Sequence, residues 1–438
     1  MNQQKEALDI FLSAVESVLP ENLIKNNLHV RNGQLTYLDV CIQLADFEHI
    51  YLIGFGKASA QMAKTMEKLL GKWLTEGHIL TKYHHSVGLQ KCFITEAGHP
   101  IPDQNGVDGS KKIRELAEKA TEKDLILVLI SGGGSSLLAD LPEKISLTEL
   151  ADLNKFLVHS GASIQEINTV RKHLSHLKGG QLARLAYPAT ILSFLISDVI
   201  GDALEVIASG PTVEDPTTFT EALQVLEKYQ LRSSISPSIL NYLESGKLGE
   251  IHETVKAGDP CLARTRNLIL GNNKMALEQA KKKATTLGYE AKIISCEVEG
   301  EVETVADYLV SEIITCREVA HGRKTALLFG GEPTVRITGS GKGGRNQHLA
   351  FLMAEKLNGL SNITFLSAGT DGTDGPTTAT GAICDGTTIR CAIDHGLKPD
   401  ELLANFDSYT LFSKTGGQIL TGPTNTNVMD LMIALLDF

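Results

Sequence analysis

The segment DLILVLISGGGSS, residues 124–136, joins a continuous apolar run to a loop made only of glycine and serine. A short apolar run that ends in turn residues is typical of a strand buried on both faces of a parallel sheet. Consecutive glycines allow the N–H groups of the loop to form a concave nest for an anion, although glycine and serine are also frequent in ordinary turns. We therefore expect a central strand followed by a candidate anion-binding loop, whose members are Ser131, Gly132, Gly133, Gly134, Ser135 and Ser136.

Other apolar runs alternate with helical patterns on both sides of this segment. Residues 49–56 (HIYLIGFG), 77–85 (GHILTKYHH) and 189–202 (ATILSFLISDVIGD) are expected to form strands. Residues 108–120 are expected to form a helix between two of them. This alternation predicts an α/β fold with a Rossmann-like, doubly wound parallel sheet. Because ligands bind beyond the carboxyl ends of such strands, the loops that follow these strands are expected to share one edge of the sheet.

The chain of 438 residues exceeds the usual size of one hydrophobic core, so two domains are expected. Residues 244–260 (ESGKLGEIHETVKAGDP) are polar and contain several glycines, which is typical of a linker. Strand and helix patterns resume after it. We therefore expect a Rossmann-like domain over residues 1–244 and a second α/β domain over residues 245–438, and we allow for the C-terminal tail packing back on the first domain.

Composition excludes several classes of protein. The net charge of −11 argues against a general nucleic-acid binder. The seven cysteines are scattered and form no C-x-x-C pair, which fits neither a disulfide framework nor a zinc site. No apolar run is long enough to span a membrane. We expect a cytoplasmic protein without a targeting segment, whose partners are small molecules and include neither nucleic acid nor membrane.

The segment GFGKAS, residues 54–59, lies between a predicted strand and a predicted helix and carries Gly54, Gly56 and Lys57. Its spacing approaches the dinucleotide fingerprint, but Ser59 replaces the last small residue, and the next strand ends in TKYHH rather than in a ribose-binding acid. NAD binding is therefore disfavoured. Two interpretations stay open: an anion site built from helix N–H groups and a lysine, or a turn with a solvated lysine. Neither GGGSSLL nor GSGKGG fits a Walker loop, so a nucleotide would be held without one.

The segment IQEINTVRKHLSHLKGG, residues 164–180, is expected to form an amphipathic helix that stops at its two glycines. Its core face consists of Ile164, Ile167, Val170, Leu174 and Leu177. Beside this face runs a polar line made of Asn168, Arg171, Ser175 and Lys178. Arginine and lysine in such a line can grip a carboxylate or phosphate, although a solvated face is an equal interpretation. His173 and His176 lack partners for a zinc site and are expected at the surface.

Acidic residues gather at predicted strand ends, namely Asp198, Asp202, Glu332, Asp371 and Asp374. Carboxylates in glycine-rich loops suit Mg²⁺, which takes one or two protein ligands and completes its shell with water and phosphates. Single acids in glycine turns also serve only to form the turn. Their density here, beside Lys342 and Arg345 in GSGKGGRNQ, favours a chemical role.

Together these motifs resemble those of the glycerate 2-kinase family over nearly the whole chain. The stretches that carry the resemblance are GFGKAS, GHPIPD (98–103), LISGGGSSLL, INTVRKHLSHLKGGQLA, SDVIGDALEVIASGPTVEDP, GGEPTVRITGSGKGGRNQHLA, AGTDGTDGPTTATGAICDG and LTGPTNTNVMDL. Many long motifs in one order are far more specific than a single glycine loop. Two positions depart from the family pattern, with Pro333 in place of a second threonine and Asn425 in place of a glycine.

The resemblance implies a Rossmann-like domain followed by a MOFRL-type domain, with the active site in the cleft between them. It also implies a kinase that depends on ATP and Mg²⁺ and phosphorylates the 2-hydroxyl of D-glycerate to give 2-phosphoglycerate. The family's active-site positions fall on Lys57, Asp198, Glu332, Arg345, Asp371 and Asn427.

These positions and the motifs suggest individual roles. Lys57 and Arg345 are expected to neutralise the transferring phosphoryl group, and the two glycine loops to cradle anions. Arg171 and Lys178 are expected to bind the glycerate carboxylate, and Asn427 to contact the substrate. The carboxylates expected to hold Mg²⁺ or to orient the hydroxyl are Asp198, Glu332 and Asp371.

Two other functions stay open. A hydroxypyruvate reductase, a label that relatives of the family have also carried, would need a complete dinucleotide fingerprint with a ribose acid, which the TKYHH strand end lacks. A non-catalytic protein that binds sugar acids or phosphate would need the anion loops but not the cluster of carboxylates.

Overall fold

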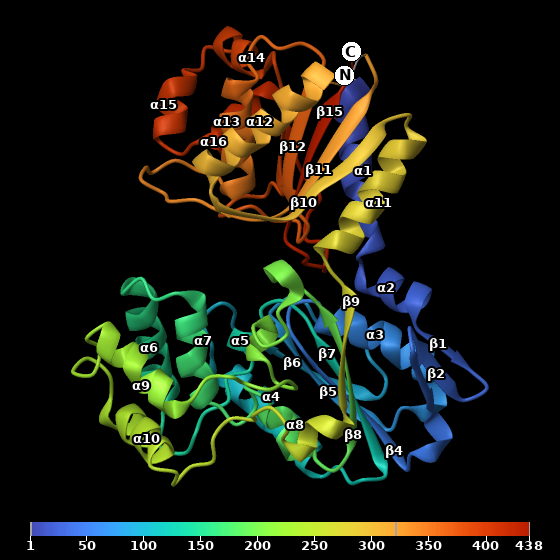
Figure 1. Ribbon diagram of the computed structural model, residues 1–438, viewed down its shortest axis with the longest axis vertical. Helices are drawn as coiled ribbons and strands as arrows, with labels where there is room; N and C mark the ends of the chain where they lie inside the picture. The colour runs from blue at the N-terminus through green and yellow to red at the C-terminus, as the bar shows by residue number, and fades with distance from the viewer. Residues whose placement is uncertain (1, 320–321, 438) are drawn as a thin grey trace. The chain divides into compact units, whose positions relative to one another are not determined.

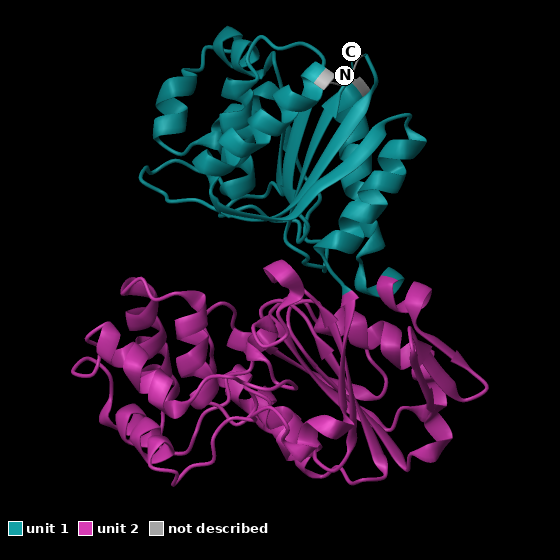
Figure 2. Cartoon of the chain, in the orientation of Figure 1, with its two compact units in different colours: residues 1–22, 271–438 teal, residues 23–270 magenta. Residues whose placement is uncertain are grey.

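The computed structural model describes residues 2–319 and 322–437. The chain divides into two compact units (Figure 2). Unit 2 comprises Leu23–Leu270, and unit 1 combines the chain up to Asn22 with the chain from Gly271 onward. Within the described residues, no helix is both long enough and apolar enough to cross a lipid bilayer.

These units differ from the predicted domains, residues 1–244 and 245–438, at both ends of unit 2. The first helix, α1 (Asn2–Ser17), packs on α11 (Asn273–Thr286) and therefore belongs to unit 1. The strand β9 (Thr265–Gly271) lies after the predicted boundary but completes the sheet of unit 2. Both assignments depend on contacts between segments that are far apart in the sequence.

A six-stranded sheet forms the centre of unit 2, in the order β6-β5-β4-β7-β8-β9 (Figure 1). Its first five strands are β6 (Cys92–Ala97), β5 (Glu76–Lys82), β4 (His49–Phe55), β7 (Asp124–Ile130) and β8 (Thr190–Ile196). Each neighbouring pair among these five is parallel. Phe55 of β4 is level with Ile130 of β7, which is level with Leu195 of β8. The loops after these strands therefore share one edge, and the predicted doubly wound parallel sheet is confirmed.

Helices cover both faces of this sheet, because side chains alternate along each strand. Ile53 and Phe55 of β4 face a core that they share with α4 (Gln104–Glu118) and α8 (Gln181–Ala186). On the opposite face Gly54 leaves room for Ser59, the first residue of α3 (Ser59–Leu70). The helix α2 (Pro20–Asn27) spans the division between the two units. The remaining short elements of unit 2 are β1 (His29–Arg31), β2 (Gln34–Tyr37), β3 (Val40–Gln43), α5 (Gly134–Leu137), η1 (Leu44–Asp46), η2 (Gly71–Trp73), η3 (Ile200–Asp202), η4 (Ile207–Ser209) and η5 (Pro260–Arg264).

Four helices form a separate layer of unit 2 (Figure 1). They are α6 (Leu147–His159), α7 (Ile164–His173), α9 (Phe219–Lys228) and α10 (Pro237–Lys247). Capping boxes at Ser146 and Ser163 begin α6 and α7. The layer has its own hydrophobic core, to which Leu153, Val170 and Leu226 contribute fully buried side chains. It supplies one wall of the candidate site described below.

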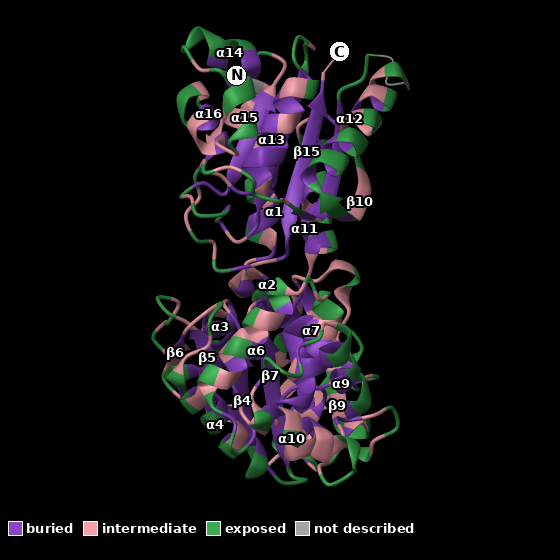
Figure 3. Ribbon diagram, turned by 90° about the vertical axis from the view of Figure 1, so that its left-hand side faces the viewer, coloured by how far each residue is buried: buried purple, intermediate pink, exposed green. Residues whose placement is uncertain are grey.

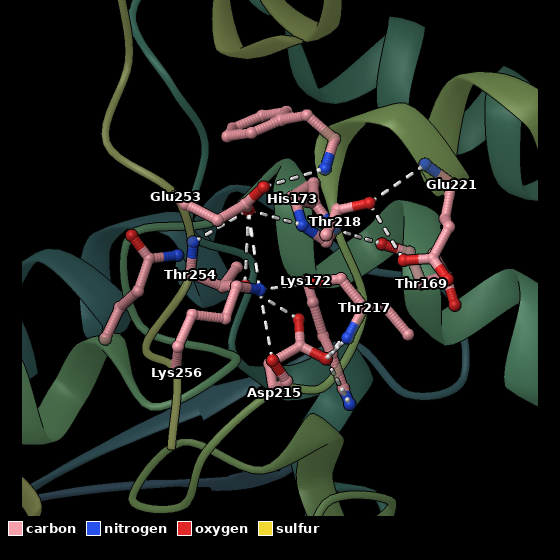
Figure 4. Close-up of polar contacts among 12 residues, drawn as sticks. Thr169, Lys172, His173, Asp215, Thr217, Thr218, Glu221, Glu253, Thr254 and Lys256 are labelled. Atoms are coloured by element: carbon pink, nitrogen blue, oxygen red, sulfur yellow. Dashed lines mark hydrogen bonds and ion pairs between the residues drawn. The ribbon is translucent and has the colours of Figure 1, made fainter. Parts of the chain in front are cut away.

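The predicted linker, residues 244–260, does not separate the two units. Val255 is fully buried, donates a backbone hydrogen bond to Gly179 (3.0 Å) and accepts one from Asp215 (2.7 Å). The Asp215 side chain in turn accepts from the buried Lys172 ammonium (3.3 Å) (Figure 4). Charged residues of this segment and of its neighbours pair with each other inside unit 2. Its polar composition therefore comes from these pairs and does not mark a linker.

His173 lies in the same network and is only 1% exposed, so the prediction of a surface histidine is wrong for this residue (Figure 4). Its Nδ1 bonds to the Thr169 carbonyl (2.7 Å), and its Nε2 bonds to Oε1 of Glu253 (2.8 Å). Each ring nitrogen therefore has a hydrogen-bond partner within unit 2. His176 is partly exposed.

This network predicts a dependence of stability on acid pH. Burial alone would raise the pKa of Glu253, but hydrogen bonds from His173 and from the N–H groups of Phe219 and Thr254 outweigh burial and lower the pKa to about 2. A lowered pKa means that the carboxylate stabilises the fold above pH about 4.5 and that this stabilisation is lost as the pH falls towards 2. Glu253→Gln is therefore expected to lower Tm at pH 7, and its deficit relative to the parent is expected to shrink below pH about 4.5. Thermal unfolding between pH 3 and 7, with the exposed Glu250→Gln as control, measures this; a deficit that stays constant with pH would contradict it.

The sheet of unit 1 has the order β10-β11-β15-β12-β13-β14 (Figure 1). Its strands are β10 (Glu290–Glu301), β11 (Thr325–Thr334), β12 (Ile363–Gly369), β13 (Gly381–Asp385), β14 (Gln418–Ile419) and β15 (Asp430–Leu436). The strand β15 runs antiparallel to both of its neighbours and is buried at every residue (Figure 3). The C-terminal tail therefore completes the centre of its own unit, where it packs against α1.

Helices also cover both faces of this second sheet (Figure 1). The helices α1 and α11 pack on one face. The opposite face carries α12 (Val302–Val319), α13 (Arg345–Lys356), α14 (Thr388–Asp394), α15 (Pro399–Ala404) and α16 (Ser408–Thr415). Phe329, Phe365 and Met432, from three neighbouring strands, pack with α12 and α13 in one core. The start of α13 and the nearby strand ends carry the predicted site residues of unit 1.

Candidate active site

Two loops at the shared edge of unit 2 hold each other in place. The Lys57 N–H donates to the Gly132 carbonyl (2.9 Å), and the Ser131 N–H donates to the Phe55 carbonyl (3.2 Å). The Ser131 hydroxyl accepts a hydrogen bond from the Ala58 N–H (3.0 Å). The two predicted anion loops therefore form one structure, and Lys57 lies where they meet.

Glycine is required where these loops approach most closely. Gly56 has φ +118°, and a Cβ there would lie 2.3 Å from the backbone of the facing loop. Gly133 has φ +81°, and a Cβ there would lie 2.7 Å from Nε2 of His99 and 3.3 Å from Cγ of Lys57. Within the described residues, the N–H groups of Gly132 and Gly133 make no hydrogen bond. Available N–H groups beside a lysine favour an anion nest over a plain turn.

A cavity of about 290 Å³ lies beside the second loop. Its lining includes Ser135, Ser136, Arg171 and Lys178. The Nε of Arg171 donates to Oδ1 of Asn154 (2.7 Å), and its terminal nitrogens have no hydrogen-bond partner among the described residues. Lys178 is buried, and its Nζ donates to a backbone carbonyl (2.5 Å). Two cations and two hydroxyls in one small cavity suit a small anion.

Two members of the predicted polar line, Arg171 and Lys178, reach this cavity, but they do not lie on one helix. The helix α7 ends at His173, because the Asp140 carboxylate accepts the Ser175 hydroxyl (3.0 Å) and draws the following turn away from the helix. Lys178 reaches the cavity from that turn. Four residues of the predicted core face are buried, but Ile164, at the first turn of α7, is 51% exposed.

Asp198 lies two residues after the end of β8, at the same edge of unit 2. Two histidines that sequence reasoning did not select also lie at this edge. His99 faces Gly133, and Nδ1 of His85 bonds to the Lys57 carbonyl (3.0 Å). Both follow strands of the parallel sheet, in GHPIPD and TKYHH, and their position beyond the carboxyl ends of β6 and β5 is the signal that could have identified them.

In unit 1, two carboxylates hold Arg345 at the start of α13. Its Nε and Nη2 donate to Asp430 (2.6 and 3.0 Å), and its Nη1 donates to Glu332 (2.8 Å). Burial would lower the pKa of Arg345, but the two carboxylates outweigh burial and raise it. The charges of Arg345, Asp430 and Glu332 sum to −1. Arg345 therefore already neutralises part of the charge of these two carboxylates when no phosphate is bound. Sequence reasoning missed Asp430, because a single acid at the start of an apolar run carries no distinctive pattern.

Asp371 and Asn427 lie on two loops of unit 1 that are bonded to each other. The N–H and hydroxyl of Thr370 both donate to the Met429 carbonyl (3.0 and 2.6 Å). Asp371 accepts from the N–H and the hydroxyl of Thr373 (both 3.0 Å), and Asn427 accepts from the Met429 N–H (3.1 Å). These bonds fix the orientation of both predicted side chains.

Two further residues singled out in the sequence have structural roles. Asp374 is buried and accepts from the N–H groups of Asn346 (3.0 Å) and Gln347 (2.8 Å), so it caps the start of α13. Asn425 has φ +62°, a left-handed conformation that glycine adopts freely and asparagine tolerates. The departure from the family's glycine therefore preserves the backbone at this position.

Among the described residues, no group of three or more His, Cys, Asp or Glu side chains is arranged to hold a metal ion. Mg²⁺ bound with a nucleotide needs only one or two carboxylates, because phosphates and water supply its other oxygens. The Glu332 side chain is 41% exposed and Asp371 is partly exposed, so both present oxygens of the required kind. This donor set fits a magnesium ion that arrives with ATP.

Comparisons with known proteins match nearly the whole chain. Residues 6–244 match a domain of unknown function, DUF4147, and residues 325–430 match the MOFRL family. The chain is 40% identical over 437 residues to a D-glycerate 2-kinase of Thermotoga maritima, which covers 99% of this chain and 98% of that protein. It is 38% identical to a glycerate 2-kinase of Pyrococcus horikoshii, over 100% of this chain and 98% of that one. The crystal structure of a glycerate kinase from Thermotoga maritima has a TM-score of 0.87 at 38% identity and covers 99% of each chain.

Proposed function

This chain belongs to the glycerate kinase family, and from that premise we propose that it transfers the γ-phosphoryl group of ATP to the 2-hydroxyl of D-glycerate, giving 2-phosphoglycerate. The observation that carries this proposal is the 40% identity to a D-glycerate 2-kinase over 99% of the chain. The cationic cavity beside the Lys57 loop supports it independently, because it suits a small anion.

The glycerate carboxylate would bind Arg171 and Lys178. A guanidinium edge and an ammonium together match the two oxygens of a carboxylate, and partial burial strengthens both interactions. The hydroxyls of Ser135 and Ser136 line the same cavity and bond to the Ser209 hydroxyl (2.7 Å) and the Gly133 carbonyl (3.1 Å), and their oxygens can still accept from the hydroxyls of glycerate. This assignment uses four of the polar side chains that line the cavity, which also include Asn154, Lys155 and His159.

The transferring phosphoryl group would bind at the two glycine loops. Phosphoryl transfer depends on positioning and on neutralisation of charge more than on covalent chemistry. Lys57 supplies a positive charge, and the N–H groups of Gly132 and Gly133 supply fixed dipoles that need no rearrangement. Their backbone bonds hold them in place before substrate binds.

In unit 1, Arg345 would orient Glu332 while it contributes to the charge balance of the phosphates. Glu332 and Asp371 of unit 1 would supply oxygens to Mg²⁺, and Asp198 is a separate candidate ligand on unit 2. When bound, this ion would neutralise negative charge on the phosphates of ATP. Asn427 would contact the substrate from its fixed loop.

A coupled assay tests the proposed reaction. Purified protein is supplied with ATP, Mg²⁺ and D-glycerate, and ADP formation is followed; a parallel reaction contains NADH and hydroxypyruvate. We expect ADP formation that requires D-glycerate and stops in excess chelator, and no oxidation of NADH. Oxidation of NADH by hydroxypyruvate without ADP formation would support the reductase instead, and binding of D-glycerate without either reaction would support a non-catalytic protein.

The carboxylate assignment predicts a pH dependence of D-glycerate binding. Burial lowers the pKa of Lys178 to about 8; Asp140 opposes this effect and Arg171 adds to it. Because the charge on Lys178 is lost as the pH rises through this value, KM for D-glycerate is expected to increase above pH about 8. Lys178→Gln is expected to raise KM at pH 7 by about tenfold, the effect of one hydrogen bond to a charged group, and to remove the increase above pH 8. Steady-state kinetics from pH 6.5 to 9.5, with the exposed Lys111→Gln as control, measure this; the parent pH dependence in Lys178→Gln would contradict it.

A further inference from the structure

His99 occupies a position at the edge of unit 2 that the mechanism above does not use. Its Nε2 lies 2.7 Å from the Cβ position of Gly133, and the Lys57 side chain lies 3.3 Å from the same point. The residues that follow it, Pro100, Ile101 and Pro102, line the cavity that contains Arg171 and Lys178. His99 therefore connects the wall of the carboxylate site to the loop that would hold the phosphoryl group.

The surroundings of His99 keep its ring neutral at ordinary pH. Burial lowers the pKa of His99 to about 4, and the positive charges of Lys57 and Lys82 act in the same direction. A hydrogen bond to its own backbone raises this pKa, and His85 lowers it by the smallest of these effects. Burial is also the main cause that lowers the pKa of His85. A neutral imidazole has one nitrogen that donates and one that accepts, so His99 is able to take up a proton.

We propose that Nε2 of His99 accepts the proton of the D-glycerate 2-hydroxyl during phosphoryl transfer, an inference that rests on the proposed kinase function. In this step the 2-oxygen forms a bond to the γ-phosphorus, and the bond from that phosphorus to the bridging oxygen of ADP breaks. ADP leaves with the electron pair of the broken bond. The hydroxyl proton moves to the lone pair of Nε2, and the imidazolium later returns it to solvent.

The chemistry of D-glycerate brings its 2-hydroxyl near the part of the cavity wall that continues into His99. The 2-hydroxyl is attached to the carbon next to the carboxylate, so a carboxylate held by Arg171 and Lys178 leaves the hydroxyl close to the cavity wall. That wall continues into His99 through Pro100. Lys57 is a cation and has no lone pair to accept a proton, and serine hydroxyls are weak bases. A general base must lie within hydrogen-bond reach of the proton it removes, which this arrangement allows.

Kinetics of two His99 variants and a matched control test the proposal. His99→Asn is expected to lower kcat by about 100-fold or more, with KM for both substrates and Tm unchanged, because general base catalysis contributes roughly this much. His84→Asn is the control: His84 is exposed on a neighbouring loop and has φ +66°, a conformation that asparagine tolerates. It is expected to retain the parent kcat. A parent protein that forms no phosphoglycerate would overturn the kinase function itself, whereas an active parent with an equally active His99→Asn would overturn only the role of His99.

Chemical rescue separates a base from a packing role. Imidazoles of increasing pKa are added to His99→Ala, and the rate of phosphoglycerate formation is measured for each. We expect the rate to recover and to rise with the pKa of the added imidazole. No recovery, or a recovery that does not depend on that pKa, would show that the ring serves only to support Gly133. A lower Tm or a raised KM in His99→Asn, with kcat unchanged, would overturn the proposal in the same way.

Discussion

Replacement of Lys57 by alanine is expected to lower kcat for D-glycerate phosphorylation by about 10²–10³-fold, the typical effect of removing one group that stabilises charge in a transition state. The backbone of Lys57 bonds to Gly132 (2.9 Å) and His85 (3.0 Å), and alanine keeps both of these bonds. The loop is therefore expected to keep its shape in the variant. The loss is expected in kcat, with Tm and KM for D-glycerate little changed.

Steady-state kinetics and thermal unfolding of the Lys57 variants check this expectation. Lys57→Arg keeps the charge but changes its geometry and is expected to recover only part of the activity. Lys68→Ala, at an exposed position on the following helix α3, is the matched control and is expected to behave as the parent. If Lys57→Ala retains the parent kcat, GFGKAS is only a turn between strand and helix, and its lysine is solvated.

Replacement of Arg345 by methionine is expected to destabilise the protein by about 3 kcal/mol, because it leaves a buried carboxylate without its partner. The Asp430 side chain is only 1% exposed, whereas Arg345 is 34% exposed, which places the expected cost at the lower end of the range for buried pairs. Activity is expected to fall as well, since Glu332 loses the bond that orients it.

A double-mutant cycle identifies the source of this loss. Urea unfolding is measured for Arg345→Met, Asp430→Asn and the double variant, and the double variant is expected to be more stable than the sum of the single changes predicts by about 1–2 kcal/mol. Arg323→Met breaks an exposed ion pair with Glu290 and is the control, with an expected cost below about 1 kcal/mol. Additive single effects, or equal costs for Arg345→Met and Arg323→Met, would show that the buried pair does not stabilise unit 1.

The parallel sheet of unit 2 could be predicted because each central strand is a short apolar run that ends in a loop. DLILVLI is buried at every residue, and the glycine loop follows it at the expected edge. The division into units could not be predicted in the same way. The pattern of α1 indicates a helix, but only its packing on α11 assigns it to unit 1. The composition of residues 244–260 is that of a linker, although Val255 is fully buried.

Within the site, the sequence indicates residues that belong to a local pattern. It does not indicate residues whose role depends on a partner far away in the chain. The spacing of Arg171 and Lys178 indicated a common site, and both line one cavity even though α7 ends between them. Asp430 is recognisable only through Arg345, far from it in the sequence. His173 was assigned to the surface because its partner, Glu253, lies in a separate segment of the chain. A sequence read locally contains no signal for such pairs.

The position of the phosphate on the product decides whether this protein is a glycerate 2-kinase. Protein, ATP, Mg²⁺ and D-glycerate are incubated together, and the product is examined by phosphorus NMR with coupling to protons retained. In 2-phosphoglycerate the phosphorus couples to the single proton on carbon 2 and gives a doublet, whereas in 3-phosphoglycerate it couples to both protons on carbon 3 and gives a triplet. We predict the doublet. A triplet, or the absence of any phosphoglycerate from protein that is folded and supplied with all three components, would contradict the proposed function.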